Sequence, residues 1–254
     1  MLLSLKRLYG QKLDTSDGEV GHVKDFYFDD RQWKVRYVVA DTGNWLRGRL
    51  VLISPHAFGA LPKIGDPLLV NLTLQQIENG PQIESHKPIS RQYEDEYFRY
   101  YGYPTYWRED ATWGTKSLPA GLPFQVLPIT EQQLAESSDD DLHLRSSNAI
   151  TDYEVATSGG DIGHVTDFLM DDKSWQIRYL VIETGHWYSG KEIVISPKDV
   201  DQISYEDSAV TLNLTRESIL KAPEYHALPL DTQGRPEIVK APSANPIPQG
   251  KNNH

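Results

Sequence analysis

The chain has 254 residues, enough for two domains of ordinary size, and its 39% hydrophobic and 24% charged residues are typical of soluble globular proteins. It contains no cysteine, which excludes disulfides, thiolate metal sites and cysteine nucleophiles, and no apolar run approaches the roughly 20 residues that span a bilayer. A formal net charge of −11 without a basic stripe argues against direct binding of nucleic acid.

The start of the chain does not resemble a secretory signal. Its basic pair, Lys6-Arg7, follows a very short apolar stretch, whereas a signal peptide has the opposite order and a longer apolar region. We therefore expect a cytoplasmic protein without a transmembrane segment.

A segment from the first half of the chain recurs in the second half at an offset of 142 residues. Residues 16–55 align without a gap on residues 158–197, and half of the positions are identical. The register continues as far as Pro81 and Pro223. This self-similarity predicts two copies of one folding unit.

The duplication divides the chain into four regions. We assign the first repeat to residues 1–82 and the second repeat to residues 146–223. Residues 83–145 form a connector between them that is rich in tyrosine and acidic residues. The last region, residues 224–254, contains many prolines and is predicted to be a disordered tail.

Each repeat is predicted to consist mainly of strands. In the first repeat, an early strand near residues 8–13 precedes a hairpin, in which residues 22–28 and 33–41 alternate between apolar and polar positions. A further strand at residues 49–53 ends at a Ser-Pro pair, because proline cannot donate to the ladder. Another strand is expected near residues 68–71.

A short helix is expected to close each repeat. In the first repeat Thr73 stands at the N-cap and Gln76 at the capping-box position, and Gly80-Pro81 ends the helix. The sequence therefore predicts a mainly β protein of two tandem small antiparallel β-barrels. Each barrel has five or six strands and a short terminal helix, and the Tyr-rich connector joins the two.

The hairpin turn at residues 29–32 determines which residues face one another. It places Asp25 opposite Arg36, and in the second repeat Asp167 opposite Arg178. We predict a cross-strand ion pair in each repeat, worth at most about 1 kcal/mol if exposed. The same register directs one largely apolar face toward the core, and its members are His22, Phe26, Phe28, Trp33, Val35, Tyr37 and Val39.

The repeated pattern resembles a known module. Its residues in the first repeat are Gly21-His22-Val23, Asp25-Phe26, Asp29-Asp30, Trp33, Arg36-Tyr37, Asp41-Thr42-Gly43, Trp45, Gly48 and Ile53-Ser54-Pro55. This pattern is similar to the PRC-barrel, which forms the cytoplasmic barrel of the photosynthetic reaction-centre H subunit and the C-terminal half of a bacterial ribosomal small-subunit maturation factor. The resemblance covers residues 4–81 and 146–223.

The resemblance implies a mode of action, docking onto protein partners, rather than a particular function. Neither the membrane helix of the H subunit nor the N-terminal barrel of the maturation factor is recognisable in this sequence. The Tyr-rich stretch with Tyr100-Tyr101-Gly102-Tyr103-Pro104 and Trp107 is similar to the connectors of uncharacterised bacterial members with two barrels.

Aromatic residues supply the candidate partner-binding positions. The loops at residues 42–49 and 184–191 each present a tryptophan among glycines, a composition suited to protein interfaces. The alternative is structural, with the tryptophans closing the barrel mouths and the tyrosines packing against the barrels. The candidate residues are Trp45, Arg47, Arg49, Trp187, Tyr100, Tyr101, Tyr103 and Trp107.

No catalytic, cofactor or metal site is predicted. The histidines do not have the spacing of a zinc site, and there is no P-loop, nucleophile elbow or dinucleotide fingerprint. Asp29 and Asp30 lie in a tight turn, where aspartate is favoured for local hydrogen bonds. His22 and His164 are expected near the core face as structural residues.

Three functional hypotheses remain open at this stage. The leading one is a non-enzymatic bacterial protein-binding or assembly module, peripheral to the inner membrane at the cytoplasmic face of a membrane or electron-transfer complex, as the reaction-centre resemblance implies. The second is a ribosome-associated or RNA-processing accessory factor that docks on a basic protein. The third is a small-ligand or enzymatic cleft between the barrels. A homo-oligomer is compatible with each.

Overall fold

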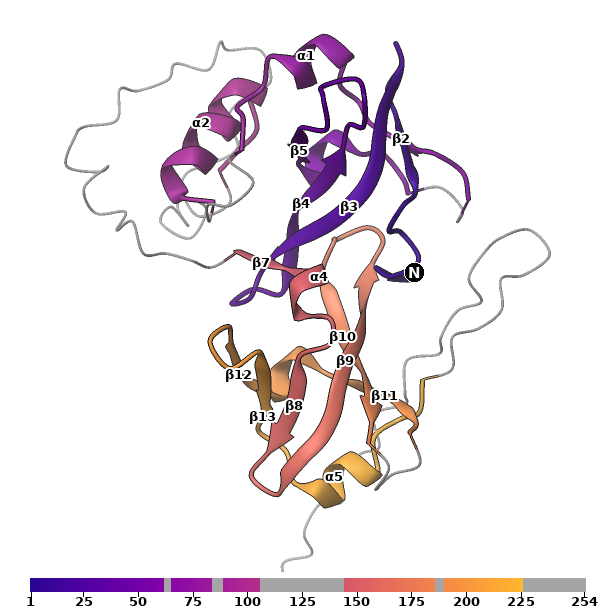
Figure 1. The fold of residues 1–254 in the computed structure, drawn as a ribbon, viewed down its shortest axis with the longest axis vertical. Coiled ribbons are helices and arrows are strands. Elements are labelled where there is room, and N and C mark those ends of the chain that lie inside the picture. Colours follow the sequence, from indigo (N-terminus) through magenta and orange to yellow (C-terminus); the bar gives the residue numbers. More distant parts are fainter. Residues whose placement is uncertain (62–64, 84–88, 106–143, 186–189, 226–254) are drawn as a thin grey trace, which may run out of the picture. The chain divides into compact units, whose positions relative to one another are not determined.

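The computed structural model describes residues 1–61, 65–83, 89–105, 144–185 and 190–225. The chain folds into two compact units (Figure 1). The first unit comprises residues 9–62 and 66–148, and the second unit comprises residues 1–8, 63–65 and 149–254.

The first unit is built on a sheet with the strand order β5-β4-β3-β2-β6. Its elements are β2 (Lys12–Asp14), β3 (Glu19–Asp29), β4 (Lys34–Asp41), β5 (Leu50–Ile53), a 3₁₀ turn (Pro55–Ala57), β6 (Leu68–Leu69), α1 (Leu74–Glu78) and α2 (Arg91–Tyr101). The predicted capping box is present, with Thr73 and Gln76 bonded to each other's backbone. Ser54 ends β5 and caps the 3₁₀ turn, as the Ser-Pro pair predicts.

The second unit repeats this arrangement with the strand order β11-β10-β9-β8-β13-β12. Its elements are β8 (Glu154–Thr157), β9 (Gly160–Asp171), β10 (Ile177–Thr184), β11 (Glu192–Ile195), a 3₁₀ turn (Pro197–Asp199), β12 (Val200–Ser204), β13 (Ala209–Leu212) and α5 (Arg216–Leu220). The prediction of two tandem, mainly β units is confirmed.

One pair of strands in each sheet runs parallel, although we expected antiparallel sheets. These pairs are β2 with β6 and β8 with β13. A hairpin forces its two strands to run antiparallel, but a long connection leaves the direction free. Here β3, β4 and β5 lie between β2 and β6 in the chain, so the parallel pairing is sterically accessible.

The two remaining strands, β1 and β7, are exchanged between the repeats. β1 (Leu2–Ser4) precedes the first repeat but pairs with β9 of the second, and β7 (Leu144–Ser146) precedes the second repeat but pairs with β3 of the first (Figure 1). Leu3 faces Met170 in one pairing. Arg145 faces Phe28 in the other, which is the same register at the offset of 142.

The compact units therefore differ from the repeats in their leading segments. Residues 1–8 belong to the unit that contains the second repeat, and the chain enters that unit within the short helix α4 (Ser147–Ile150). The ranges 1–82 and 146–223 describe the duplication in the sequence. The assigned tail, from residue 226 onward, lies outside the described residues.

The hairpin register differs from the predicted one. Asp25 faces Val39 rather than Arg36, and register shifts mark two irregularities along β3 and β4, one after Val23 and one after Tyr27. The second repeat shifts in the same way, between β9 and β10. Such bulges are invisible to a periodicity argument, because one extra residue leaves the alternation intact on either side of it.

The bulges also divide the predicted core face in two. Phe26, Phe28 and Val35 are fully buried, as predicted. Tyr37 instead faces Tyr27, the neighbour of Phe26 on the opposite side of the strand, and packs with α2. His22, which we expected near the core, is exposed.

Candidate functional site

Helix α2 lies against the sheet of the first unit (Figure 1). Tyr97 and Phe98 of the helix form a buried cluster with Tyr37, Val39 and Leu52 of the strands. The side chain of Ser90 caps the start of the helix, and Gly102 ends it with a left-handed φ of 69°. The first tyrosines of the connector therefore pack against the sheet, which is the structural alternative considered for these residues.

Tyr97 also closes the edge of the sheet. Its buried hydroxyl accepts a hydrogen bond from the backbone N–H of Ser54 (2.9 Å) and donates one to the carbonyl of Leu52 (3.1 Å), both on the edge strand β5 or directly after it. Burial raises the pKa of this phenol well above its usual value, so it stays protonated. The hydroxyl of Tyr97 thus bonds to backbone groups at the sheet edge that a neighbouring strand would otherwise pair.

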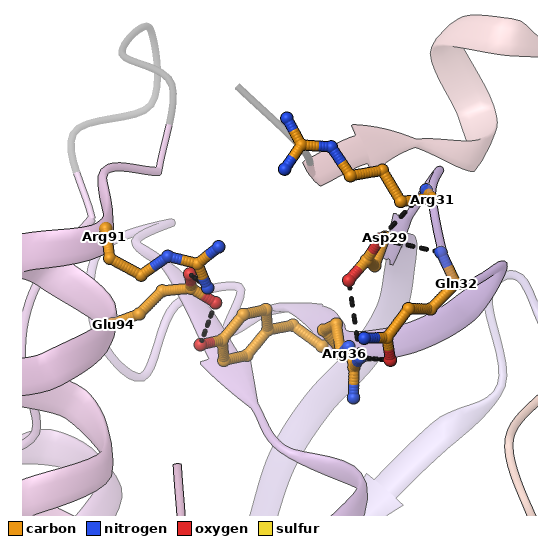
Figure 2. Close-up of polar contacts among 7 residues, drawn as sticks. Asp29, Arg31, Gln32, Arg36, Arg91 and Glu94 are labelled. Atoms are coloured by element: carbon orange, nitrogen blue, oxygen red, sulfur yellow. Dashed lines mark hydrogen bonds and ion pairs between the residues drawn. The ribbon is translucent and has the colours of Figure 1, made fainter. Parts of the chain in front are cut away.

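A buried carboxylate anchors the first half of α2. Glu94 has no exposed surface; it accepts a hydrogen bond from the hydroxyl of Tyr37 (3.0 Å) and pairs with Arg91 one turn earlier (3.0 Å) (Figure 2). A buried charge is tolerated when it is paired and hydrogen-bonded in this way. Nothing in our sequence analysis pointed to Glu94, although its spacing from Arg91 is that of an i, i+3 pair.

Three of the predicted partner-binding residues converge on the last turn of α1. Arg49 donates to the carbonyls of Ile77 (3.3 Å) and Glu78 (3.0 Å). The hydroxyls of Tyr100 and Tyr101 both donate to the carbonyl of Gln76, at 3.1 and 3.4 Å. These side chains satisfy carbonyls that a helix end leaves open. We call Arg49, Tyr100, Tyr101 and the loop at residues 42–48 the aromatic-basic patch.

The members of the aromatic-basic patch differ in exposure. Tyr100 is 44% exposed and Arg47 is exposed, whereas Trp45 is half-buried. Tyr103 lies beside the patch, where its ring stacks on His56 with the ring centres 5.3 Å apart. The other two candidates, Trp107 and Trp187, lie outside the described residues.

The predicted ion pairs do not form. Arg36 pairs with Asp29 (3.3 Å) and bonds to Gln32 rather than reaching Asp25 (Figure 2). The shifted register separates Asp25 from Arg36, and it brings Asp167 opposite Val181 instead of Arg178. The prediction was wrong because it assumed an uninterrupted hairpin.

Asp25 and Asp167 instead form hydrogen bonds with the exchanged segments, which contain β7 and β1. Asp25 accepts hydrogen bonds from the hydroxyls of Ser146 and Ser147 and from the backbone N–H of Asn148 (3.0 Å). Asp167 does the same for the hydroxyl of Ser4 and the N–H of Lys6 (2.9 Å). Burial raises the pKa of both carboxyls, opposed in part by these hydrogen bonds.

Asp29 has the local role expected of a turn aspartate, whereas Asp30 pairs with Arg145 of β7. Asp29 accepts from the backbone N–H groups of Arg31 (2.9 Å) and Gln32 (3.0 Å) (Figure 2). In the second repeat Asp171 accepts from Ser174, and that contact lowers its pKa. Within the described residues, no group of three histidine, aspartate or glutamate side chains is placed to hold a metal ion.

Each repeat also contains a shallow groove at the same position. The groove of the first unit has a volume of about 390 Å³ and lies between residues 14–16 and 69–73. Its counterpart of about 450 Å³ lies between residues 157–158 and 211–215. Hydroxyl, amide and apolar residues line both grooves, and each groove also contains one aspartate, Asp14 in the first and Asp201 in the second.

Two sheets of equivalent strand order define a duplicated β module. The family model for the PRC-barrel domain matches residues 3–71 and 145–219, one segment for each repeat. The chain therefore belongs to the PRC-barrel family. No curated protein matches the sequence.

Proposed function

We propose that the chain is a non-enzymatic protein-binding or assembly module that contacts its partner through the aromatic-basic patch. The observation that carries this proposal is the way Tyr100 is held: its hydroxyl is fixed on α1 while 44% of the residue stays exposed. Aromatic and arginine side chains held in place are the usual anchors of protein interfaces, because little entropy is lost on binding.

The difference between the repeats supports this assignment. In the second repeat Lys191 takes the place of Arg49 and bonds to Glu224. The edge strand β11 is covered by the backbone of residues 223–225, where the first repeat uses Tyr97. Among the described residues, the contacts of Arg49, Tyr100 and Tyr101 with α1 therefore distinguish the first repeat from the second, as expected of a surface with its own task.

The cellular location and the class of partner that we propose rest on the family resemblance. We propose a position at the cytoplasmic face of a bacterial membrane or electron-transfer complex, with a subunit of that complex as the partner. In the part of the chain that the structure describes, no helix has the length and apolar character needed to cross a bilayer. Attachment to such a complex would then depend on protein contacts.

A ribosome-associated accessory role is the second candidate, because the formal charge of −11 suits contact with a basic ribosomal protein. Affinity purification of the tagged full chain from its host, followed by mass spectrometry, separates the candidates. Membrane-complex subunits support the first and ribosomal proteins the second. A small-molecule or enzymatic role would instead show as ligand-dependent stabilisation or turnover.

The partner recovered in this way allows a direct test of the aromatic-basic patch. Tyr100→Ala and Arg47→Ala should each weaken binding, with Tyr100→Ala costing about 1–2 kcal/mol, or about 5- to 30-fold in Kd. Tyr205→Ala is the matched control, since Tyr205 is 42% exposed but lies in the second unit. Calorimetry gives the Kd, and a thermal melt confirms that each variant folds.

Two outcomes would overturn the proposal. One is unchanged affinity in both patch variants. The other is a measurable turnover of the chain that His22→Ala or Asp29→Ala abolishes without altering the melt.

A further inference from the structure

Each unit contains a binding site for an extended segment, and the chain fills both sites with its own exchanged strands. The site in the second unit consists of the edge of β9 and the buried carboxylate of Asp167, which is 6% exposed. The site in the first unit consists of β3 and Asp25, which is 8% exposed.

The features that these sites recognise are few and local. Besides the backbone ladder, each aspartate accepts from the hydroxyl of the serine in the strand and from the N–H two residues further on. These donors are Ser4 and Lys6 at Asp167, and Ser146 and Asn148 at Asp25. Asp25 also accepts from the hydroxyl of Ser147. Both segments read Leu-x-Ser in the strand. The middle residue differs between the two segments: Leu3 is buried in one, and Arg145 pairs with Asp30 in the other.

Continuity of the chain is not part of either site. Ser4 and Asp167 are 163 residues apart in the sequence, and Ser146 and Asp25 are 121 residues apart. The strand pairing and backbone hydrogen bonds that place this segment beside β9 include Leu2, Leu3, Ser4, Leu5 and Lys6, the last two through their own N–H groups. A strand of the same sequence from another molecule would make the same contacts.

We propose that these sites also accept the equivalent strand of a second copy of this chain, so that the protein self-associates by strand exchange. The hydrogen bonds gained between copies equal those lost within one copy, as in other domain swaps. The balance then depends on the protein concentration relative to the effective concentration of the chain's own strand, which is in the millimolar range for a tethered segment. The inference is independent of the aromatic-basic patch.

The absence of cysteine permits a clean test. Leu2 and Asp171 face each other across β1 and β9, and both are partly exposed. Facing residues in antiparallel strands are about 4.5–5.5 Å apart at Cα, within the range that a disulfide spans. Leu2→Cys and Asp171→Cys are prepared as single variants. They are mixed at concentrations up to about millimolar, passed briefly through partial denaturation, returned to native buffer and oxidised.

The expected result is a disulfide-linked dimer of twice the chain mass, formed at least severalfold more in this mixture than in the control and increasing with concentration. The control is Leu2→Cys mixed with Asp201→Cys, which places an exposed thiol elsewhere in the second unit, on β12. The double variant Leu2→Cys/Asp171→Cys, oxidised at low concentration, should form the disulfide within one chain.

Failure has two distinguishable forms, and both overturn the proposal. If the double variant closes internally but the mixture yields no more dimer than the control, the chain retains its own strands. If the double variant does not close, β1 does not lie on β9. Should Asp171→Cys lower the melting temperature, the unsubstituted chain is given the same treatment and its mass is measured by light scattering. A dimer that increases with concentration supports the proposal, and a monomer at every concentration overturns it.

Discussion

At the scale of single residues, the most informative feature is the pair of buried aspartates. Asp25 and Asp167 occupy the same position in the two repeats and receive the same donors. Sequence periodicity placed them on an outward face with an arginine opposite. Their actual donors come from segments more than 100 residues away, and alternation within one hairpin carries no information about such contacts.

Replacing Asp25 with asparagine should change how stability depends on pH. The folded-state pKa is raised above the unfolded value of 3.8, so the carboxyl contributes stability below pH 3.8 that is lost as the pH rises through the folded pKa. The free energy of unfolding of the wild type, relative to Asp25→Asn, should therefore increase as the pH falls from about 7 to about 4. Urea denaturation across this range measures it.

The exposed residue Asp201 provides the control for this experiment. Asp201→Asn should leave the difference from the wild type nearly constant across the same range. If the free energy of unfolding of the wild type relative to Asp25→Asn decreased toward acid pH, the assignment of a raised pKa would be wrong.

Some identities between the repeats have a direct steric reason. A Cβ on Gly21 would lie 2.0 Å from the carbonyl oxygen of Asp41, and one on Gly163 would lie 1.9 Å from that of Glu183. The backbone at Gly21 also has a φ of 141°, which favours glycine. The sequence shows that a glycine occupies this position in both repeats, and the structure shows which backbone approaches it.

At the scale of elements, the sequence contained a helix pattern for α2 that we did not recognise. Tyr93, Tyr97 and Tyr101 are spaced four residues apart, which aligns them along one side of a helix, and Ser90 and Gly102 are suitable caps. We predicted a Tyr-rich connector and placed no helix in it. Charged residues lie between the tyrosines, yet one of them, Glu94, is buried, so the charges do not mark the exposed side of the helix.

Removing the hydroxyl of Tyr97 should destabilise the first unit. Tyr97→Phe keeps the ring in its cluster but leaves the N–H of Ser54 and the carbonyl of Leu52 without this partner, at a cost of about 1–3 kcal/mol. Tyr100→Phe removes a hydroxyl from an exposed bond and should cost less than about 0.5 kcal/mol. Denaturant unfolding of both variants provides the comparison, and equal costs would show that Tyr97 does not protect the edge of β5.

At the scale of the whole molecule, the duplication predicted two units of the same fold, and the structure confirms this. The strand exchange could not be predicted, because Leu-x-Ser precedes both repeats, and β3 and β9 receive it in the same register. A sequence pattern specifies which residues suit a strand but not which of two equivalent neighbours receives it. The candidate site was predicted in part, through Arg49, Tyr100 and Tyr101.

A substitution in β1 should destabilise the unit that contains the second repeat. Leu3 is 2% exposed, so Leu3→Ala removes buried apolar contacts at a cost of about 2–5 kcal/mol. Hydrogen exchange should accelerate at the amides of β9, while the amides of β3 keep their protection. Leu13→Ala in β2, which pairs with β3, should have the converse effect. Loss of protection in β3 upon Leu3→Ala would mean that β1 pairs within its own repeat.

The exchange of β1 also has a consequence for folding during synthesis, because β1 leaves the ribosome long before its partner β9. Ser4 leaves the exit tunnel 163 residues before Asp167, an interval of roughly 10–30 s at ordinary elongation rates. During this time β1 has been synthesised but its native acceptor has not, while the equivalent strand β3 is already available beside it. The nascent chain must therefore either leave this apolar segment unpaired or pair it temporarily with β3 and release it when β7 emerges. Elongation rate and chaperone access thus become determinants of the yield of correctly exchanged protein.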